Sequence, residues 1–519
     1  MRELIELIET LNVGKLKLKE LWAAVIQPGS KMEQLYDLIQ SGQVSTDEAA
    51  IARLYASPGE ASRFPSLKNK LKERLLDVVF LLDFRSPAFT DRQKAHFECN
   101  KRLATAAVLL SRGAELAGIE LLELLLRHTQ YFEFTDLTIK ILYYLRRHYG
   151  TVATDAKKFE SYRRQYEEYQ EIWIMENKAE ELYGQLVSRY ISTGAEDKAV
   201  VQKAAEYFEE IAPLMARSSS FRLHLFGRLL QLSIYSSIND SHMLGDLCRQ
   251  AITFFKEKPY DPNMSLQAFY YNLVVSHIQL HQFDQGQEIL REYSFVYEEG
   301  SFNWFKWQEL YMLLALHTGH FNEAFSLCEG ILGHLKFGKQ PAHVQESWKI
   351  YDAYIHFLAR AGKFSRPVNK NFKPGKFLNE TPVFSKDKRG RNIPILIARI
   401  LFFMADQKRD AFIDAVEALD KYNRRYLKKG ETFRSHCFIK MLLQIPAANF
   451  HPEAVSRKTE KLFHLLESTP LQIANQAYEI EIIPYEVLWS IITGMIAAQQ
   501  PTQNRMAKTE RIAQAQIRK

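Results

Sequence analysis

Apolar residues recur every three or four positions along most of the chain, which is the spacing of one face of an α-helix. One such helix is expected to begin near Pro65, where a proline fits the first turn. Its apolar face consists of Leu67, Leu71, Leu75, Val78, Val79 and Leu82. Alternation with a period of two, typical of strands, is almost absent. The pattern predicts an all-α protein.

Uninterrupted helices are expected between Pro87 and Pro213, because this stretch contains no proline. An earlier helix is expected to start at Ser45, since Ser45 and Glu48 have the spacing of a capping box. The same reasoning predicts helices near 91–112, 114–129, 134–149, 155–192, 196–212, 220–236 and 241–257, and again over 395–404, 410–426, 432–443, 454–467 and 485–497.

An aromatic stripe follows the expected helix at 155–192. It comprises Phe159, Tyr162, Tyr166, Tyr169 and Trp173, in alternating steps of three and four. A coiled-coil partner is one interpretation. Packing against neighbouring helices of the same chain is the other interpretation. It is favoured because two heptads are too few to establish a coiled coil.

Three short turn sequences recur in the middle of the chain. They are His281-Gln282-Phe283, Gly319-His320-Phe321 and Gly362-Lys363-Phe364. The second is followed by the small residue Ala324, and Gly286 takes that place after Phe283. This segment resembles tetratricopeptide repeats, in which units of about 34 residues pair two helices around such a turn.

The resemblance is best over residues 265–364 and implies helical hairpins stacked in an irregular α-solenoid. The repeats are irregular, because the three Phe residues of these turns are 38 and 43 positions apart. We therefore expect five regions: an N-terminal helical region (1–150), tetratricopeptide-like hairpins (151–364), a basic inserted loop or small β-hairpin (365–392), C-terminal hairpins (393–498) and a basic polar tail (499–519).

The inserted segment is strongly basic. Residues 363–391 contain nine Lys or Arg residues and two acidic ones, and their prolines and glycines exclude a continuous helix. In the hairpin alternative, Phe377 and Leu378, and then Val383 and Phe384, form two short strands. The tail adds five basic residues and one acidic one. Without both segments the formal charge of +7 becomes about −4, so the basic character is local.

Concentrated positive charge indicates an anionic partner, and nucleic acid is one candidate. Lys386, Lys388, Arg389 and Arg391 are the expected anion-binding residues, with Phe372, Phe377 or Phe384 stacking on a base. The alternative is a solvated loop, or a loop that pairs with acidic side chains of the same chain.

Signatures of common enzymes are missing, including phosphate-binding loops, zinc-protease helices and nucleophile elbows. His96 and Cys99 share a helical face, but no second ligand pair lies nearby in sequence. Glu479, Glu481 and Glu486 suggest acid–base chemistry, although helix caps or salt bridges are the simpler interpretation. We expect no enzymatic activity, no cofactor and no metal.

The expected location is a reducing cytoplasm. The chain begins with acidic residues instead of a secretory signal, and Cys99, Cys248, Cys328 and Cys437 are widely spaced. The longest apolar stretch, 393–405, is shorter than the roughly 20 residues of a membrane-spanning helix. No membrane association is expected.

The leading hypothesis is a non-catalytic intracellular adaptor or scaffold that binds a protein or peptide in a groove lined by aromatic residues. The expected lining is Tyr270, Trp307, Tyr311, Trp348 and Tyr351. The same residues at helical spacing are also typical of a core. The alternative function is a nucleic-acid-associated protein that contacts phosphates through residues 363–391 and the tail.

The nucleic-acid alternative predicts a steep salt dependence. If the net seven positive charges of residues 363–391 each contacted a phosphate, log affinity plotted against log salt would have a slope of about −6. Filter binding of a labelled oligonucleotide at several salt concentrations measures this slope. An affinity that is unchanged by salt would exclude the alternative.

Overall fold

The structure is a computed structural model that describes residues 1–13, 27–79, 91–193, 198–238, 240–364, 372, 375, 377, 389–426, 433–469, 471 and 481–498. All regular secondary structure in these ranges is helical, which confirms the all-α class. The chain forms two compact units. Unit 1 comprises Met1–Trp173 with Pro259–Asp261, and unit 2 comprises Ile174–Lys258 with Pro262–Lys519. No described helix is long and apolar enough to cross a bilayer.

The first helices of unit 1 enclose a small apolar core built around Leu35, Leu71 and Leu75. They are α1 (Arg2–Val13), α3 (Lys31–Gln40), α4 (Asp47–Leu54), α5 (Pro58–Ala61) and α6 (Phe64–Val79). The N-cap of α4 is Thr46, whose side chain accepts a hydrogen bond from Ala49 N. The expected start at Ser45 was therefore wrong by one position.

A second apolar core of unit 1 lies among α7 (Asp91–Ser111), α8 (Glu115–Tyr131), α9 (Thr135–Thr151) and the first half of α10 (Ala156–Thr193). Helix α8 packs on both α7 and α9. Four members of the aromatic stripe pack against this core, namely Phe159, Tyr162, Tyr166 and Tyr169. These four residues therefore pack within their own chain, as the second interpretation of the stripe expected, whereas Trp173 is 42% exposed.

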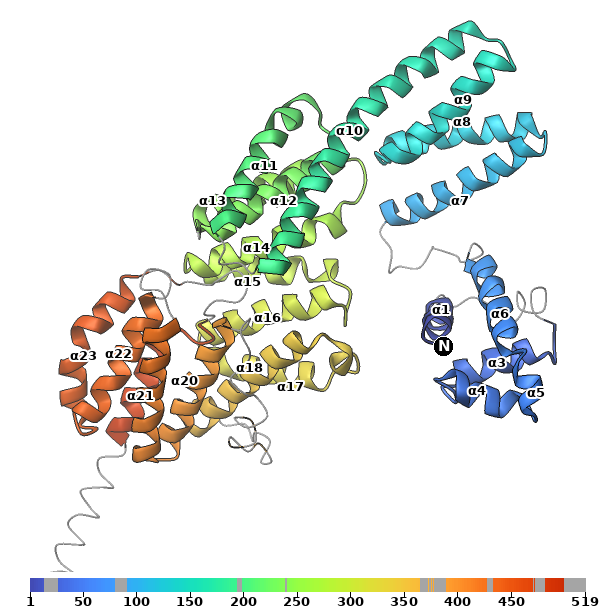
Figure 1. The fold of residues 1–519 in the computed structure, drawn as a ribbon. Helices are drawn as coiled ribbons and strands as arrows, with labels where there is room; N and C mark the ends of the chain where they lie inside the picture. The colour runs from blue at the N-terminus through green and yellow to red at the C-terminus, as the bar shows by residue number, and fades with distance from the viewer. Residues whose placement is uncertain are drawn as a thin grey trace, which may run out of the picture. The chain divides into compact units, whose positions relative to one another are not determined.

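Unit 2 continues from the second half of α10 as a series of helices that each pack on the next (Figure 1). They are α11 (Lys198–Arg217), α12 (Phe221–Ser237), α13 (Ser241–Lys256), α14 (Asn263–Gln279), α15 (Phe283–Glu292), η1 (Ser294–Val296), α16 (Phe302–His317), α17 (Phe321–Leu332), η2 (Phe337–Lys339), α18 (Ala342–Arg360), α20 (Arg389–Ala405), α21 (Arg409–Tyr426), α22 (Phe433–Ala447), α23 (Pro452–Glu467) and a helix over 485–498. Helix α16 also packs on α14 and α18, so these three form an inner layer. Helical hairpins are therefore the structural unit of this region.

The three recurring turns end the three inner helices. Each turn contains a residue with positive φ, namely His281 (57°), Gly319 (76°) and Gly362 (69°), and this conformation suits glycine best. Helices α15 and α17 begin at the expected Phe283 and Phe321. The predicted turns are confirmed, whereas the tetratricopeptide arrangement stays a prediction.

Most of the basic inserted segment lies outside the described residues, as do Leu378, Val383, Phe384 and the tail. Phe377 is helical and 8% exposed, so the strand predicted there was wrong. Phe372 stacks on His356 of α18, with ring centroids 4.0 Å apart and planes at 10°. Phe377 is therefore closed to a base, and one face of the partly buried Phe372 ring is covered by His356.

Candidate functional site

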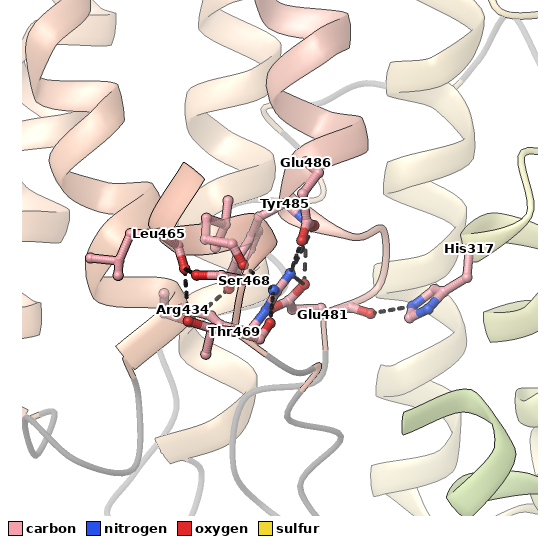
Figure 2. Close-up of polar contacts among 10 residues, drawn as sticks. His317, Arg434, Leu465, Ser468, Thr469, Glu481, Tyr485 and Glu486 are labelled. Carbon is pink, nitrogen blue, oxygen red and sulfur yellow. Dashed lines mark hydrogen bonds and ion pairs between the residues drawn. The ribbon is translucent and has the colours of Figure 1, made fainter. Parts of the chain in front are cut away.

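Arg434, near the start of α22, is a fully buried charge in unit 2, with 1% of its surface exposed. Figure 2 shows its guanidinium at the centre of a polar cluster. Nε and Nη2 donate to the two carboxylate oxygens of Glu481, at 2.6 and 3.0 Å. Nη2 also donates to the carboxylate of Glu486, at 2.7 and 2.8 Å. Nη1 donates to the carbonyls of Leu466 and Thr469, at 2.7 and 2.6 Å.

All five N–H groups of the guanidinium are therefore used. A buried charge is tolerated only when it is paired and fully hydrogen-bonded, and Arg434 meets both conditions. Burial alone would lower the pKa of Arg434, but the hydrogen bonds and charges of Glu481 and Glu486 outweigh it and raise that pKa. The side chain is thus held in its charged form inside the protein.

The cluster also fixes the start of the helix at 485–498. Tyr485 N donates to Glu481 Oε2 at 3.2 Å, so the Glu481 side chain caps the helix. Glu486 lies in the first turn, where a negative charge is favourable. The ring of Tyr485 stacks on Phe438 of α22 at 4.4 Å, and its hydroxyl is 2.8 Å from Ser435 Oγ. Polar and aromatic contacts therefore join this helix to α22.

His317, the last residue of α16, connects the cluster to the inner layer (Figure 2). Its Nε2 lies 2.8 Å from the carbonyl of Glu481, and because a carbonyl only accepts, this nitrogen carries the proton. Nδ1 is buried without a hydrogen-bond partner among the described residues. Burial lowers the pKa of His317 to about 4, so the imidazole is neutral near pH 7.

This arrangement is suited to holding four segments together, namely α16, α22, the end of α23 and the segment at 481–498. Both carboxylates are occupied by Arg434, and Glu481 is only 4% exposed, so neither is free to exchange protons with a substrate. Glu481 and Glu486 form salt bridges, as the simpler sequence interpretation expected, while Glu479 lies outside the described residues. No group of three potential metal ligands occurs in the described ranges.

The sequence analysis missed Arg434 and His317. A local signal existed for Arg434, because it precedes the apolar run Cys437, Phe438 and Ile439. Glu481 is likewise flanked by isoleucines. An ionisable residue within an apolar segment suggests a buried partner of opposite charge, but the two residues are 47 positions apart, and no periodicity between them would pair them.

A second candidate site is a shallow apolar groove between α10 and α12, with a volume of about 440 Å³. Its lining comprises Glu180, Tyr183, Gly184, Val187, Ser188 and Phe226. Tyr183 and Phe226 lie against each other with ring centroids 5.7 Å apart. Burial raises the pKa of Tyr183. A Cβ added at Gly184 would meet no atom within 4 Å, so the groove is open above this glycine.

The five aromatic residues expected to line a groove are placed differently. Trp307, Trp348, Tyr270 and Tyr351 are at most 2% exposed, and Tyr311 is partly buried. Trp307 stacks on Tyr297 at 4.3 Å, and Tyr270 stacks on Tyr293 at 3.9 Å. The four buried side chains belong to the core and offer no surface to a partner in this conformation.

The expected anion-binding residues are only partly within the described chain. Lys386 and Lys388 lie outside it, and Arg389 and Arg391 belong to the first turn of α20, with side chains that are not described. Cys99 is buried, which raises the pKa of its thiol to about 11, and all four cysteines are buried and unpaired. These thiols are therefore unreactive.

A scan against protein-family models found no match to this chain, and searches of curated proteins and of solved structures found none either.

Removing the buried charge should weaken the attachment of the helix at 485–498. We expect Arg434→Met to cost about 3–5 kcal/mol, because it leaves Glu481 buried without its partner. Arg424→Met is the matched control, since Arg424 also pairs with an acid, Asp420, but its side chain is 75% exposed. The control should cost about 0–1 kcal/mol. Hydrogen exchange of residues 485–498 measures both effects, and equal protection in the two variants would contradict the assignment.

His317 should make unit 2 sensitive to acid. Its pKa falls from 6.5 to about 4 on folding, so the folded protein binds fewer protons than the unfolded chain. The stabilisation is complete above pH 6.5 and is lost as the pH falls toward 4, by at most about 3 kcal/mol.

The measurement is the midpoint of urea unfolding, followed from pH 7.5 to pH 4. His317→Gln should make this pH profile shallower, and His356, whose pKa burial also lowers to about 4, keeps part of the remaining slope. His464→Gln, at a side chain that is 72% exposed, should leave it unchanged. Parallel profiles for the wild type and His317→Gln would refute the role of His317.

Proposed function

We propose that this protein is a non-catalytic intracellular adaptor or scaffold that binds a protein or peptide through the surface of its helical hairpins. The observation that carries the proposal is the apolar groove between α10 and α12. Helical hairpins provide extended surfaces of this kind in many interaction proteins. Four buried, unpaired cysteines are also what a reducing compartment favours.

The groove suits a short peptide segment with one apolar anchor. Tyr183 and Phe226 form its floor, and Val187, which is 36% exposed, extends the apolar surface. Aromatic side chains supply much of the binding energy at protein interfaces. Because Gly184 has no side chain, the backbone of a bound peptide can approach α10 closely.

The rim of the groove favours a peptide with a basic residue beside its anchor. Glu180 lines the groove with its side chain 44% exposed, although it also pairs with Arg222 of α12. Glu181 is exposed one position further along α10. Two acidic side chains next to an apolar surface complement an apolar residue flanked by Lys or Arg.

Gly184→Leu should block binding without harming the fold. The new side chain fills the groove, and replacing a mid-helix glycine stabilises α10 by roughly 0.5–1 kcal/mol. Gly494→Leu is the matched control, because Gly494 is also exposed, helical and free of atoms within 4 Å of an added Cβ. The measurement is affinity capture from a lysate of the source cells with each variant as bait, with and without nuclease, read by mass spectrometry.

The proposal expects a protein that binds the wild type and Gly494→Leu, is lost with Gly184→Leu, and survives nuclease. Identical capture by all three baits would exclude the groove. Partners that disappear with nuclease would instead favour the nucleic-acid alternative.

A further inference from the structure

Two neighbouring loops of unit 2 carry opposite charges. The acidic loop (residues 293–301) joins α15 to α16 and includes Glu298 and Glu299. The basic loop (residues 333–341) joins α17 to α18 and includes Lys336 and Lys339. Each loop leads from an outer helix back to an inner one. In consecutive hairpins, such connections lie on the same edge of the stack.

Contacts between the loops show that they lie side by side. Gly300 has φ of +76°, and a Cβ at this position would fall 2.6 Å from Lys336 Cδ and 2.8 Å from His334 Cε1. The glycine thus lets the stem of Lys336 lie directly on the acidic loop. Gln340 Nε2 also donates to the carbonyl of Gly300 at 3.3 Å. The two loops therefore form one continuous surface.

Large apolar side chains protrude from this surface. Leu335 of the basic loop is 98% exposed, and Phe295 of the acidic loop is 68% exposed. Phe302, the first residue of α16, is 44% exposed beside them. Single exposed apolar residues are common, but three large ones on two contacting loops and the adjoining start of α16 favour an interaction site.

The charges of the two loops are largely left for an external partner. Glu299 lies 3.6 Å from His334, at the boundary between the loops. In the described part of the chain, Glu298, Lys336 and Lys339 have no ion pair, and all three are exposed. Apart from the Glu299–His334 contact, and with Lys256 held by the Tyr293 hydroxyl at the far end of the acidic loop, the surface presents an exposed acidic side and an exposed basic side, each with one protruding apolar side chain.

We propose that this surface binds a second copy of the same chain, forming a symmetric dimer. A two-fold axis between the loops places the acidic loop of each copy opposite the basic loop of the other. Glu298 and Glu299 then meet Lys336 and Lys339 of the partner copy, twice. Phe295 of one copy faces Leu335 of the other in the same arrangement, and Phe302 lies near the axis.

The charge pattern favours a second copy over an unrelated partner. A partner with a single sign of charge would be attracted by one loop and repelled by the other. A surface whose halves are opposite and adjacent complements itself after a rotation of 180°. The surface shares no residue with the groove between α10 and α12, so the dimer and the proposed adaptor function fail independently.

Charge reversal tests the dimer with two purified variants. The all-acidic variant carries Lys336→Glu and Lys339→Glu, and the all-basic variant carries Glu298→Lys and Glu299→Lys. Each alone places like charges opposite each other at both loop contacts, so its dimer dissociation constant should rise roughly a hundredfold. Mixing them should restore a heterodimer, because each acidic loop then faces a basic one. Analytical ultracentrifugation over a range of concentrations measures all three samples.

The control is Lys440→Glu with Lys461→Glu, at exposed positions of α22 and α23. It changes the net charge by the same amount as the all-acidic variant. It should dimerise like the wild type. Leu335→Glu should lose the dimer while keeping the wild-type circular dichroism spectrum, since this side chain makes almost no contact within its own chain. A wild type that stays monomeric at every concentration, or two reversed variants that dimerise alone and gain nothing on mixing, would overturn the proposal.

Discussion

The architecture of unit 2 depends on the burial of its inner helices α14, α16 and α18. Helices α14 and α16 are apolar on nearly all sides, and α18 is buried from Ala353 to Leu358, so each must be covered by its neighbours before it is stable in water. Three polar side chains of α14 and α16 hydrogen-bond to the backbone of neighbouring segments. Gln267 donates to the carbonyl of Val296, Ser276 donates to that of Ser241, and His317 donates to that of Glu481. These bonds fix which loop or helix lies beside each hairpin.

The same burial explains what could be predicted from the sequence. A helix with one apolar face can be predicted from the spacing of its apolar residues. Accordingly, α7, α9, α21 and α23 begin and end within about two residues of the predicted bounds. The inner helices α14 and α16 show little such asymmetry, and the second half of α18 is buried throughout. Their aromatic residues therefore could be read equally well as a groove lining or as core, and Trp307 and Trp348 are core. Phe372 was a candidate for base stacking because its ring partner, His356, can be identified only from the fold.

Ion pairs between residues far apart in the chain could not be predicted from the sequence, for a different reason. Arg434 and Glu481 belong to separate helical segments, and their pairing is decided by how α22, α23 and the helix at 485–498 pack. The open groove and the charged loops also depend on helices that are distant in sequence or on connections between hairpins. Local propensity describes such segments one at a time, whereas these surfaces exist only when segments meet.

The buried guanidinium also has a consequence for the order of folding during synthesis. Arg434 leaves the ribosome well before Glu481, which follows it by 47 positions. Until then α22 can bury its apolar residues only by leaving a charge without its partner, which is strongly unfavourable. The nascent hairpin of α22 and α23 must therefore stay open, or keep Arg434 in water, while the intervening chain is translated. This part of the protein therefore completes its folding only after Glu481 has been translated, however fast its individual helices form.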